Sequence, residues 1–356
     1  MVEGVRKIGV VGAGTMGAGV AQAFAAAGYP VTLRDIAQAP LDRGMGAIRK
    51  SLDRLIARGK LAAADKDATL GRIKATTTIE DLADCDVVVE AVLERFDLKK
   101  AVMGDLDRVC RPDAILATNT SSISVTRIAA TSKAPARVIG MHFFNPVPMM
   151  QLVEIIRALQ TSDETCAKIV ALTEAIGKKA RVAKDSYGFV VNRLLMPMIN
   201  EAINCVYEGL ASPEDVDHVE TRRQPSDGAA VARRPYRLDI VLDIMETLYN
   251  GFDDSKYRPS PLLKQMCDAG YLGRKTGKGF FPTSSRLDRT NRIPRREWGR
   301  AWRRLGRSLA LSTPDFRPVP PCRPRSQAAA RRRFLQSVPK ETALVFGRLV
   351  DGDFDA

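Results

Sequence analysis

The chain has 356 residues, of which 45% are hydrophobic, so it can bury the core of one large or two ordinary domains and is not intrinsically disordered. No run approaches the roughly 20 apolar residues that cross a bilayer, and no signal-peptide pattern opens the chain, so no membrane partner is expected. Six cysteines stand at scattered positions without the spacing of metal ligands. This usage favours a reducing compartment, the cytoplasm, and no metal site.

The formal net charge of +14 is concentrated in two segments. Residues 282–356 hold 17 Lys and Arg against seven Asp and Glu, and residues 220–237 hold five Arg against two acids. The rest of the chain is nearly neutral. The positive charge therefore gives little support to nucleic acid as a partner of the main body.

The apolar pattern predicts alternating strands and helices in the first half of the chain and helices alone from residue 163 onward. Strands are predicted at 7–11, 31–35, 86–92, 114–118 and 137–142. Helices are predicted at 16–27, 39–60, 163–176, 188–209 and 238–250. We therefore predict an α/β Rossmann-type, doubly wound parallel sheet over residues 1–186, followed by a smaller all-α domain over residues 187–281.

A glycine-rich run, Gly12-Ala13-Gly14-Thr15-Met16-Gly17, lies between the first predicted strand and helix. The first glycine allows a tight turn, the second lets the backbone approach a pyrophosphate, and the third lets helix and strand pack closely. Asp35 ends the next strand, where a carboxylate binds the adenosine ribose and repels a 2′-phosphate. The pattern predicts an NAD site that includes Gly12, Gly14, Thr15, Met16, Gly17 and Asp35. FAD binding and a purely structural turn are the alternatives.

One of the two histidines of the chain, His142, ends the fifth predicted strand. Ligands bind at the carboxyl edge of a doubly wound sheet, and a histidine there is suited to take a proton from an alcohol near neutral pH. Glu154, in the next apolar run, is a candidate to hold the imidazole tautomer. On these residues alone, a structural histidine is an equally good interpretation.

Several motifs together resemble the L-3-hydroxyacyl-CoA dehydrogenases, and the bacterial 3-hydroxybutyryl-CoA type is the most similar. They are the glycine run, Glu90-Ala-Val-Leu-Glu94, Asn119-Thr-Ser-Ser122, His142-Phe-Phe-Asn-Pro-Val-Pro148, Gly188-Phe-Val-Val-Asn-Arg-Leu194, Ala211-Ser-Pro-Glu-Asp-Val-Asp217 and Tyr271-Leu-Gly-Arg-Lys-Thr-Gly-Lys-Gly-Phe280. The resemblance covers about residues 1–219 and 238–281.

The resemblance implies an NAD-dependent enzyme that oxidises a short-chain acyl-CoA substrate and forms a homodimer through its helical domain. The implied catalytic residues are His142, Glu154, Ser121 and Asn192. Those implied around the nicotinamide and its ribose are Glu94, Lys99, Asn145 and Lys275. Those implied at the CoA phosphates are Ser51 with Arg58 or Lys60, and Ser121 is also expected to contact the substrate.

Two segments depart from the family pattern. One nucleotide string encodes residues 220–238 in one reading frame and the family's own segment in the next, so two compensating frame errors are the hypothesis for 220–237. Residues 282–356 form an Arg- and Pro-rich tail, expected to be irregular, and a further frame change is our favoured interpretation. A genuine basic tail that binds acidic partners is the alternative. Since buried unpaired charges destabilise a fold, dimerisation and activity of this chain stay open.

Two other functions remain open from the sequence. One is a related dehydrogenase that acts on a free hydroxy acid. The other is a catalytically impaired NAD-binding remnant. Acyl chain length and pathway are not encoded in any motif of the chain.

Overall fold

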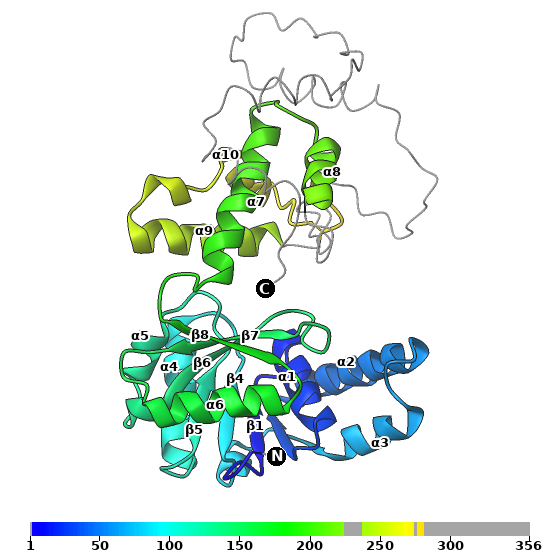
Figure 1. Ribbon diagram of the computed structural model, residues 1–356, viewed down its shortest axis with the longest axis vertical. Helices are drawn as coiled ribbons and strands as arrows, with labels where there is room; N and C mark the ends of the chain where they lie inside the picture. The colour runs from blue at the N-terminus through cyan, green and yellow to red at the C-terminus, as the bar shows by residue number, and fades with distance from the viewer. Residues whose placement is uncertain (1, 224–236, 274–275, 281–356) are drawn as a thin grey trace, which may run out of the picture. The chain divides into compact units, whose positions relative to one another are not determined.

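The computed structural model describes residues 2–223, 237–273 and 276–280. The predicted tail at 282–356 and most of the segment at 220–237 lie outside these residues. Figure 1 shows the order of the elements. The strands are β1 (Ile8–Val11), β2 (Val31–Arg34), β3 (Ile73–Thr76), β4 (Val87–Glu90), β5 (Ile115–Thr118), β6 (Val138–Phe143), β7 (Leu152–Arg157) and β8 (Lys179–Lys184).

The helices fall into two groups along the chain. Those among the strands are α1 (Thr15–Ala26), α2 (Gln38–Ala57), α3 (Ala63–Gly71), α4 (Phe96–Val109), α5 (Val125–Ala129) and α6 (Asp163–Ala175), with short 3-10 helices at Ile79–Leu82 and Pro135–Arg137. Those after the strands are α7 (Val191–Tyr207), α8 (Pro213–Arg223), α9 (Leu238–Phe252) and α10 (Pro261–Asp268), with a 3-10 helix at Ser255–Tyr257. The predicted division into an α/β part and a helical part is thus observed.

The eight strands form one sheet in the order β3-β2-β1-β4-β5-β6-β7-β8. The first six strands are parallel, which confirms the predicted doubly wound arrangement. Beyond these six strands the sheet is mixed, because β7 runs antiparallel to β6 and β8 runs parallel to β7. This reversal places β6 and β7 in direct antiparallel register, with His142 opposite Glu154.

Two strands at the edges of the sheet were not predicted. In β3 only the first of four side chains is buried, and in β8 only Ala180 is buried. Edge strands bury little side-chain surface and commonly carry charges, so their sequences lack the apolar run that marks a central strand. The prediction of helices alone after residue 163 was wrong for this reason at β8.

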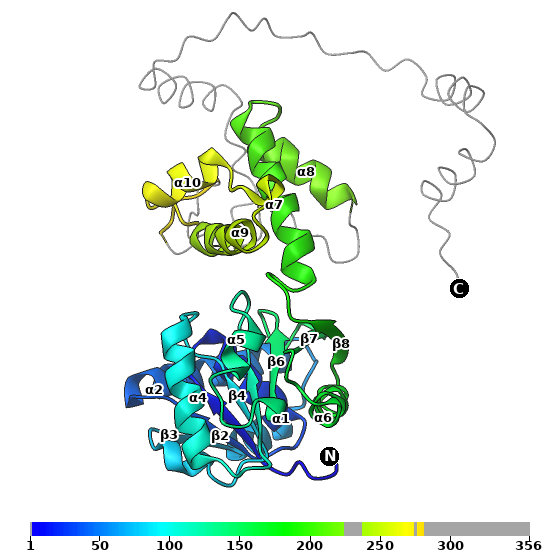
Figure 2. The same ribbon diagram turned by 90° about the vertical axis from the view of Figure 1, so that its left-hand side faces the viewer.

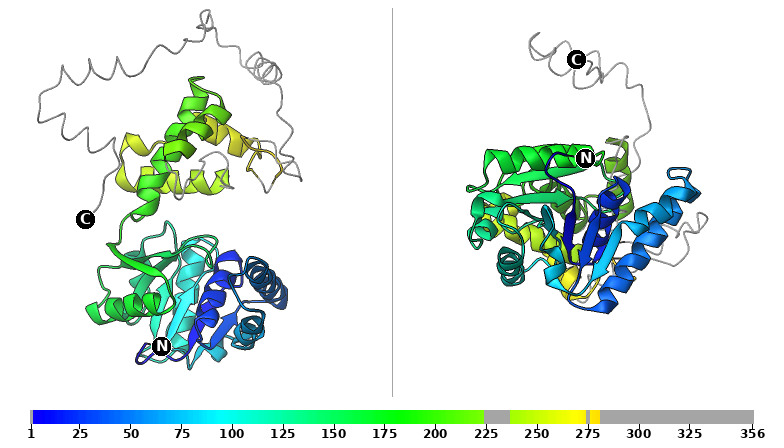
Figure 3. Two further views of the ribbon diagram at one scale, coloured as in Figure 1. Left: turned by 45° about the vertical axis from the view of Figure 1, so that its right-hand side comes forward. Right: turned by 90° about the horizontal axis from the view of Figure 1, so that it is seen from below.

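Helices cover both faces of the sheet (Figures 1 and 2). One face packs against α1, α2 and α6 through large side chains such as Phe24, Leu41 and Ile169. The other packs against α4 and α5 through Met103, Leu106 and Ile128. The helices α2 and α3 lie next to each other beside the first strands (Figure 3). The carboxyl ends of the central strands therefore form one edge, at which Asp35, Ser121 and His142 lie.

The helices α7, α9 and α10 bury a separate apolar cluster that includes Met245, Leu248 and Leu263. Asn200 fixes the turn before α10, since its side chain donates to the Arg258 carbonyl oxygen and accepts from the Ser260 amide. Within the described ranges, no helix is long and apolar enough to cross a membrane.

Candidate active site at the carboxyl edge of the sheet

The three glycines of the turn between β1 and α1 each meet a different steric condition. Gly12 has φ of +100°, and a Cβ there would lie 2.6 Å from the Ala91 carbonyl oxygen. A Cβ on Gly17 would lie 1.8 Å from the Gly12 carbonyl oxygen, so helix and strand could not pack as they do. A Cβ on Gly14 would meet no atom within 4 Å. The backbone at Gly14 therefore faces open space, as an approaching pyrophosphate requires.

The amino end of α1 is suited to hold an anion. Its cap residue is Gly14, which makes no side-chain hydrogen bond to the helix, and the first turn holds no acidic residue. The free amides and the helix dipole there favour negative charge. Asp35 lies beside this turn, where its carboxylate accepts hydrogen bonds from the amides of Ala13 and Ile36, each at 2.7 Å. These residues fit a dinucleotide with an unphosphorylated ribose.

The candidate base and its carboxylate partner are in contact. A hydrogen bond of 2.8 Å joins His142 Nδ1 to Glu154 Oε2, and the two residues are 4% and 2% exposed. Within the described ranges, no residue is hydrogen-bonded to His142 Nε2. The second oxygen of Glu154, Oε1, accepts the amides of Val190 and Val191 at 3.1 and 3.0 Å. The imidazole is thus oriented from one side and leaves Nε2 for a reacting group.

A buried ion pair lies at the carboxyl ends of β4 and β5. Lys99 is 1% exposed and Glu90 is fully buried, and Lys99 Nζ lies 2.8 and 3.1 Å from the two Glu90 oxygens. Glu90 also accepts the Thr118 hydroxyl and the Val92 amide, each at 2.7 Å. Every oxygen of this buried carboxylate therefore has a partner.

Glu94 connects the buried lysine to the loop after β5. Its Oε2 lies 3.3 Å from Lys99 Nζ, and its Oε1 accepts the amides of Ser121 and Ser122 at 2.8 and 2.9 Å. Burial raises the pKa of this carboxyl, but the charge of Lys99 and the hydrogen bonds from Thr120, Ser121 and Ser122 outweigh it and hold the pKa below its usual range. Glu94 is accordingly a carboxylate at neutral pH.

The loop after β5 brings two further predicted residues together. The Asn192 side-chain amide, in the first turn of α7, donates to the Ser121 carbonyl oxygen at 3.2 Å. The Ser121 hydroxyl makes no hydrogen bond to another described residue. Asn119 fixes the strand beside this loop, since its side chain accepts the Phe143 amide at 2.9 Å. The hydroxyl of Ser121 is thus free for a ligand.

Among the described residues, Asn145, Ser51, Arg58 and Lys60 form no hydrogen bond or ion pair with this cluster. Asn145 is exposed in the loop after His142. Ser51 lies on α2, and Arg58 and Lys60 are exposed at the end of that helix. Lys275 lies outside the described residues.

Two further residues, Glu90 and Phe189, contact the candidate site but were not predicted to belong to it. Glu90 ends a buried strand within a quoted motif, and an acidic residue in that place was an available signal. Phe189 packs its ring against His142, with ring centroids 5.4 Å apart. Its role depends on a backbone conformation that the sequence does not display.

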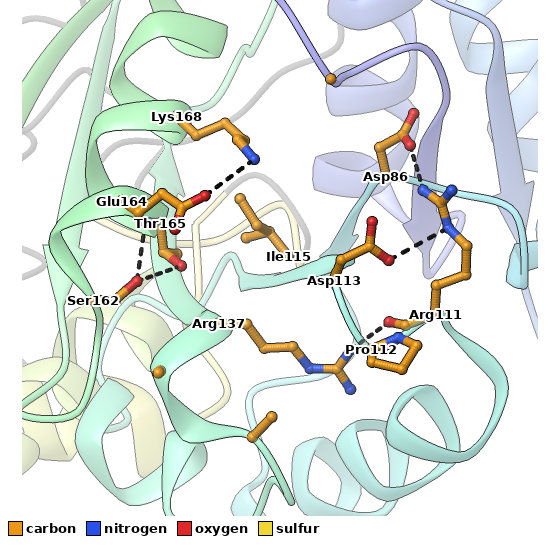
Figure 4. A pocket seen from close by; sticks show the side chains of 13 residues that line it. Asp86, Arg111, Pro112, Asp113, Ile115, Arg137, Ser162, Glu164, Thr165 and Lys168 are labelled. Carbon is orange, nitrogen blue, oxygen red and sulfur yellow. Dashed lines mark hydrogen bonds and ion pairs between the residues drawn. The ribbon is translucent and has the colours of Figure 1, made fainter.

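A cavity of about 350 Å³ lies at the opposite, amino edge of the sheet (Figure 4). Two arginines that line this cavity already form ion pairs. Arg111 pairs with Asp86, and Arg137 pairs with Asp107 at 2.6 Å. The Nε atoms of both arginines are buried and have no hydrogen-bond partner among the described residues. The described ranges contain no group of residues suited to hold a metal ion.

Comparison with known proteins gives two matching family models. The model of the 3-hydroxyacyl-CoA dehydrogenase NAD binding domain matches residues 7–186, and that of the 3-hydroxyacyl-CoA dehydrogenase C-terminal domain matches residues 188–282. A probable 3-hydroxybutyryl-CoA dehydrogenase of Deinococcus radiodurans is 50% identical over 276 residues, which are 77% of this chain and 99% of that protein. Its counterpart in Bacillus subtilis is 45% identical over 278 residues, 78% of this chain and 97% of that protein.

Solved structures give the same result. The crystal structure of (S)-3-hydroxybutyryl-CoA dehydrogenase from Ralstonia eutropha is 48% identical with a TM-score of 0.75, covering 79% of this chain and 99% of that one. The crystal structure of Mycobacterium tuberculosis FadB2 is 40% identical with a TM-score of 0.77, covering 79% of this chain and 100% of that one.

Proposed function

The chain belongs to the 3-hydroxyacyl-CoA dehydrogenase family, and on this premise we propose that it oxidises a short-chain (S)-3-hydroxyacyl-CoA, such as 3-hydroxybutyryl-CoA, to the 3-oxoacyl-CoA. It is an NAD-dependent dehydrogenase. The observation that carries the proposal is the buried His142–Glu154 pair, which leaves one imidazole nitrogen for the substrate.

His142 acts as the base in this proposal. Its Nε2 takes the proton of the substrate hydroxyl, while the hydrogen on the carbon that bears this hydroxyl leaves as hydride. The two electrons of the O–H bond form the second bond of the new carbonyl. NAD, when bound, supplies the acceptor for that hydride. Glu154 accepts a hydrogen bond from Nδ1–H, so Nε2 is the unprotonated nitrogen and the imidazolium that forms is stabilised.

Ser121 and Asn192 hydrogen-bond the reacting oxygen and polarise the carbonyl on the thioester side of the substrate. The free Ser121 hydroxyl donates to the reacting oxygen as negative charge develops on it. Asn192 contributes from the first turn of α7, where its amide already contacts the Ser121 carbonyl oxygen. A donor fixed before the reaction lowers the barrier because it needs no reorganisation.

The residues that would hold NAD divide by the part of the cofactor that they contact. The turn with Gly12, Gly14, Thr15, Met16 and Gly17 holds the pyrophosphate, and Asp35 binds the adenosine ribose. Glu94 and Lys99, with Asn145 and Lys275, surround the nicotinamide and its ribose. The structure supports this assignment through the open space at Gly14 and the contact of Glu94 with Lys99.

The CoA part of the substrate is assigned to Ser51 with Arg58 or Lys60. The two cations lie at and just beyond the end of α2 and are exposed, as contacts to phosphates require. We also propose a homodimer formed through the helical domain at 187–281, in which residues 220–237 are the aberrant segment.

The experiment is oxidation of NADH by acetoacetyl-CoA with the purified full chain, followed by absorbance. We expect turnover with acetoacetyl-CoA, none with free acetoacetate, and a loss of about 10²–10⁴ in kcat for His142→Ala. The matched control is His218→Ala, because the only other histidine is exposed and hydrogen-bonded to a backbone oxygen of its own helix. Turnover of acetoacetate in preference to its CoA ester would contradict the proposal.

A second version of the chain, with residues 220–237 replaced by the family's in-frame segment, separates the fold from the chemistry. Turnover by both versions supports the assignment and shows that the active site tolerates the altered segment. Turnover by the replaced version alone supports the assignment and identifies 220–237 as damage. If neither version turns over while NADH still binds, the acyl-CoA substrate is wrong.

A further inference from the structure

The connection between β8 and α7 has an unusual backbone. Gly188 has φ of +69° and Phe189 has φ of +51°, so two consecutive residues are left-handed. Glycine tolerates this conformation, but a side chain such as phenylalanine does not favour it. Backbone strain of this kind persists only where the surrounding structure holds it, and it concentrates at functional sites.

The corner places the phenyl ring of Phe189 against the candidate base. Phe189 is 3% exposed, and its ring meets the His142 ring edge to face with centroids 5.4 Å apart. Phe144 also contacts the imidazole, at 4.5 Å between centroids. The imidazole plane is therefore fixed by two aromatic rings as well as by its hydrogen bond.

The same corner directs two amides at the partner carboxylate. Immediately after Phe189, the amides of Val190 and Val191 donate to Glu154 Oε1. They belong to the amino end of α7, where the cap residue Val190 makes no side-chain hydrogen bond to the helix. A carboxylate from β7 thus takes the place of a helix cap, and the positive end of the helix dipole favours its ionised form.

We propose that Gly188 and Phe189 are positioning residues for the catalytic pair: their left-handed corner fixes the imidazole plane and holds Glu154 in the orientation that sets the His142 tautomer. The proposal rests on the proposed role of His142 as the base. In this proposal Phe189 does not contact the reacting atoms but acts through His142 and Glu154. The alternative is that Phe189 only fills the core that it shares with α4 and α5.

Two substitutions separate the ring from the backbone. Phe189→Leu removes the ring and keeps an apolar side chain. Gly188→Ala keeps the ring of Phe189 and disturbs the left-handed corner. An alanine at this position disfavours the positive φ, and its Cβ would lie 2.8 Å from Leu248 Cδ2. The control is Phe24→Leu, which removes a fully buried ring from the core on the other face of the sheet.

The measurement is the tautomer of His142 by ¹⁵N NMR of histidine-labelled full chain. The sequence contains only His142 and His218, so His218→Ala assigns both signals. We expect the neutral ring to carry its proton on Nδ1 in the parent chain and in Phe24→Leu. We expect Phe189→Leu and Gly188→Ala to show a mixture of tautomers and at least a tenfold lower kcat, with the KM for NADH unchanged.

A parent-like tautomer and kcat in both Phe189→Leu and Gly188→Ala would overturn the proposal. Equal losses in Phe24→Leu would also overturn it, since the effect would then be one of stability. NADH binding by each variant shows that the cofactor domain is folded. The tautomer seen by NMR does not depend on turnover. If acetoacetyl-CoA is not a substrate, the proposed function fails, but the effect of the two substitutions on the His142 tautomer can still be measured.

Discussion

The buried ion pair between Lys99 and Glu90 allows a quantitative test of what holds the site together. Lys99→Met removes the charge and leaves Glu90 fully buried with only neutral donors, the Thr118 hydroxyl and the Val92 amide. Removing one partner of a buried pair costs about 3–5 kcal/mol, because the other charge stays in a medium of low polarity. Glu90→Gln should cost less, since Lys99 keeps Glu94 at 3.3 Å as a second partner.

Replacing both residues removes the unpaired charge. The double variant, Glu90→Gln with Lys99→Met, should therefore recover most of the stability lost in Lys99→Met alone. We expect the free energy of unfolding of Lys99→Met to fall by about 3–5 kcal/mol and that of the double variant by less than about 2 kcal/mol. Both should bind NADH more weakly, because Glu94 loses the cation beside it.

The assay is urea unfolding of the full chain followed by far-ultraviolet circular dichroism. Tryptophan fluorescence is unsuitable because both tryptophans, Trp298 and Trp302, lie in the tail. With a slope of about 2–3 kcal/mol per molar urea, Lys99→Met should lower the midpoint by roughly 1–2.5 M. The control is Lys74→Met, which removes one partner of an exposed pair at 2.9 Å and should leave the urea midpoint close to that of the parent chain. A midpoint for Lys99→Met equal to that of Lys74→Met would refute the reasoning.

Three further predictions concern the glycine turn, the adenosine ribose and the buried thiols. Gly14→Ala should fold normally and bind NADH at least tenfold more weakly, whereas Gly17→Ala should not form a stable cofactor domain, because its Cβ would lie 1.8 Å from a carbonyl oxygen of the turn; calorimetric titration and thermal unfolding distinguish the two. Asp35→Ala should lower the ratio of kcat/KM for NADH over NADPH at least tenfold, and an unchanged ratio would assign the discrimination to other residues. Burial raises the pKa of Cys85 to about 12 and that of Cys110 to about 11. The stability that each protonated thiol contributes is fully present below the ordinary thiol pKa and is lost as the pH rises through about 11 for Cys110 and about 12 for Cys85. Neither thiol should react with iodoacetamide at pH 8 before unfolding, which mass spectrometry of peptides checks.

The sequence was sufficient to predict the central part of the fold. The five predicted strands correspond to β1, β2, β4, β5 and β6, because central strands of a parallel sheet are apolar on both faces. The edge strands β3 and β8 could not be predicted in this way, since one buried side chain in each gives no periodic signal. The antiparallel direction of β7 could not be predicted from the sequence either. This direction places Glu154 opposite His142.

The candidate site shows the same division. Side chains that follow apolar strands, such as His142 and Asp35, could be proposed as site residues from the sequence because topology gathers the ends of parallel strands at one edge. The second contact of Glu154, to the amides of α7, depends on the left-handed corner at Gly188 and Phe189, and a sequence does not display a dihedral angle.

The frame-error hypothesis for 220–237 and 282–356 is tested on the nucleic acid and not on the protein. Resequencing of the coding DNA should show compensating one-base changes that bracket 220–237 and a further change near residue 282. An unambiguous read of the same frame would exclude a sequencing error and leave a mutation or a genuine tail. In that case, binding of acidic polymers that is lost on deletion of 282–356 and falls steeply with salt would favour the genuine tail.

Three carboxylates of the candidate site, Glu154, Glu94 and Glu90, each hold a neighbouring segment or side chain in place. Glu154 holds the first turn of α7, Glu94 holds the loop with Ser121, and Glu90 holds Lys99, which in turn lies against Glu94. Because each carboxylate is both a partner of a cation or imidazole and an acceptor of backbone or hydroxyl groups, neutralising one should move a segment as well as remove a charge. A variant that removes one of these charges is therefore expected to change both the position of the substrate and the affinity for the cofactor. Its kcat and KM should change together, whereas a purely electrostatic role would change only one of them.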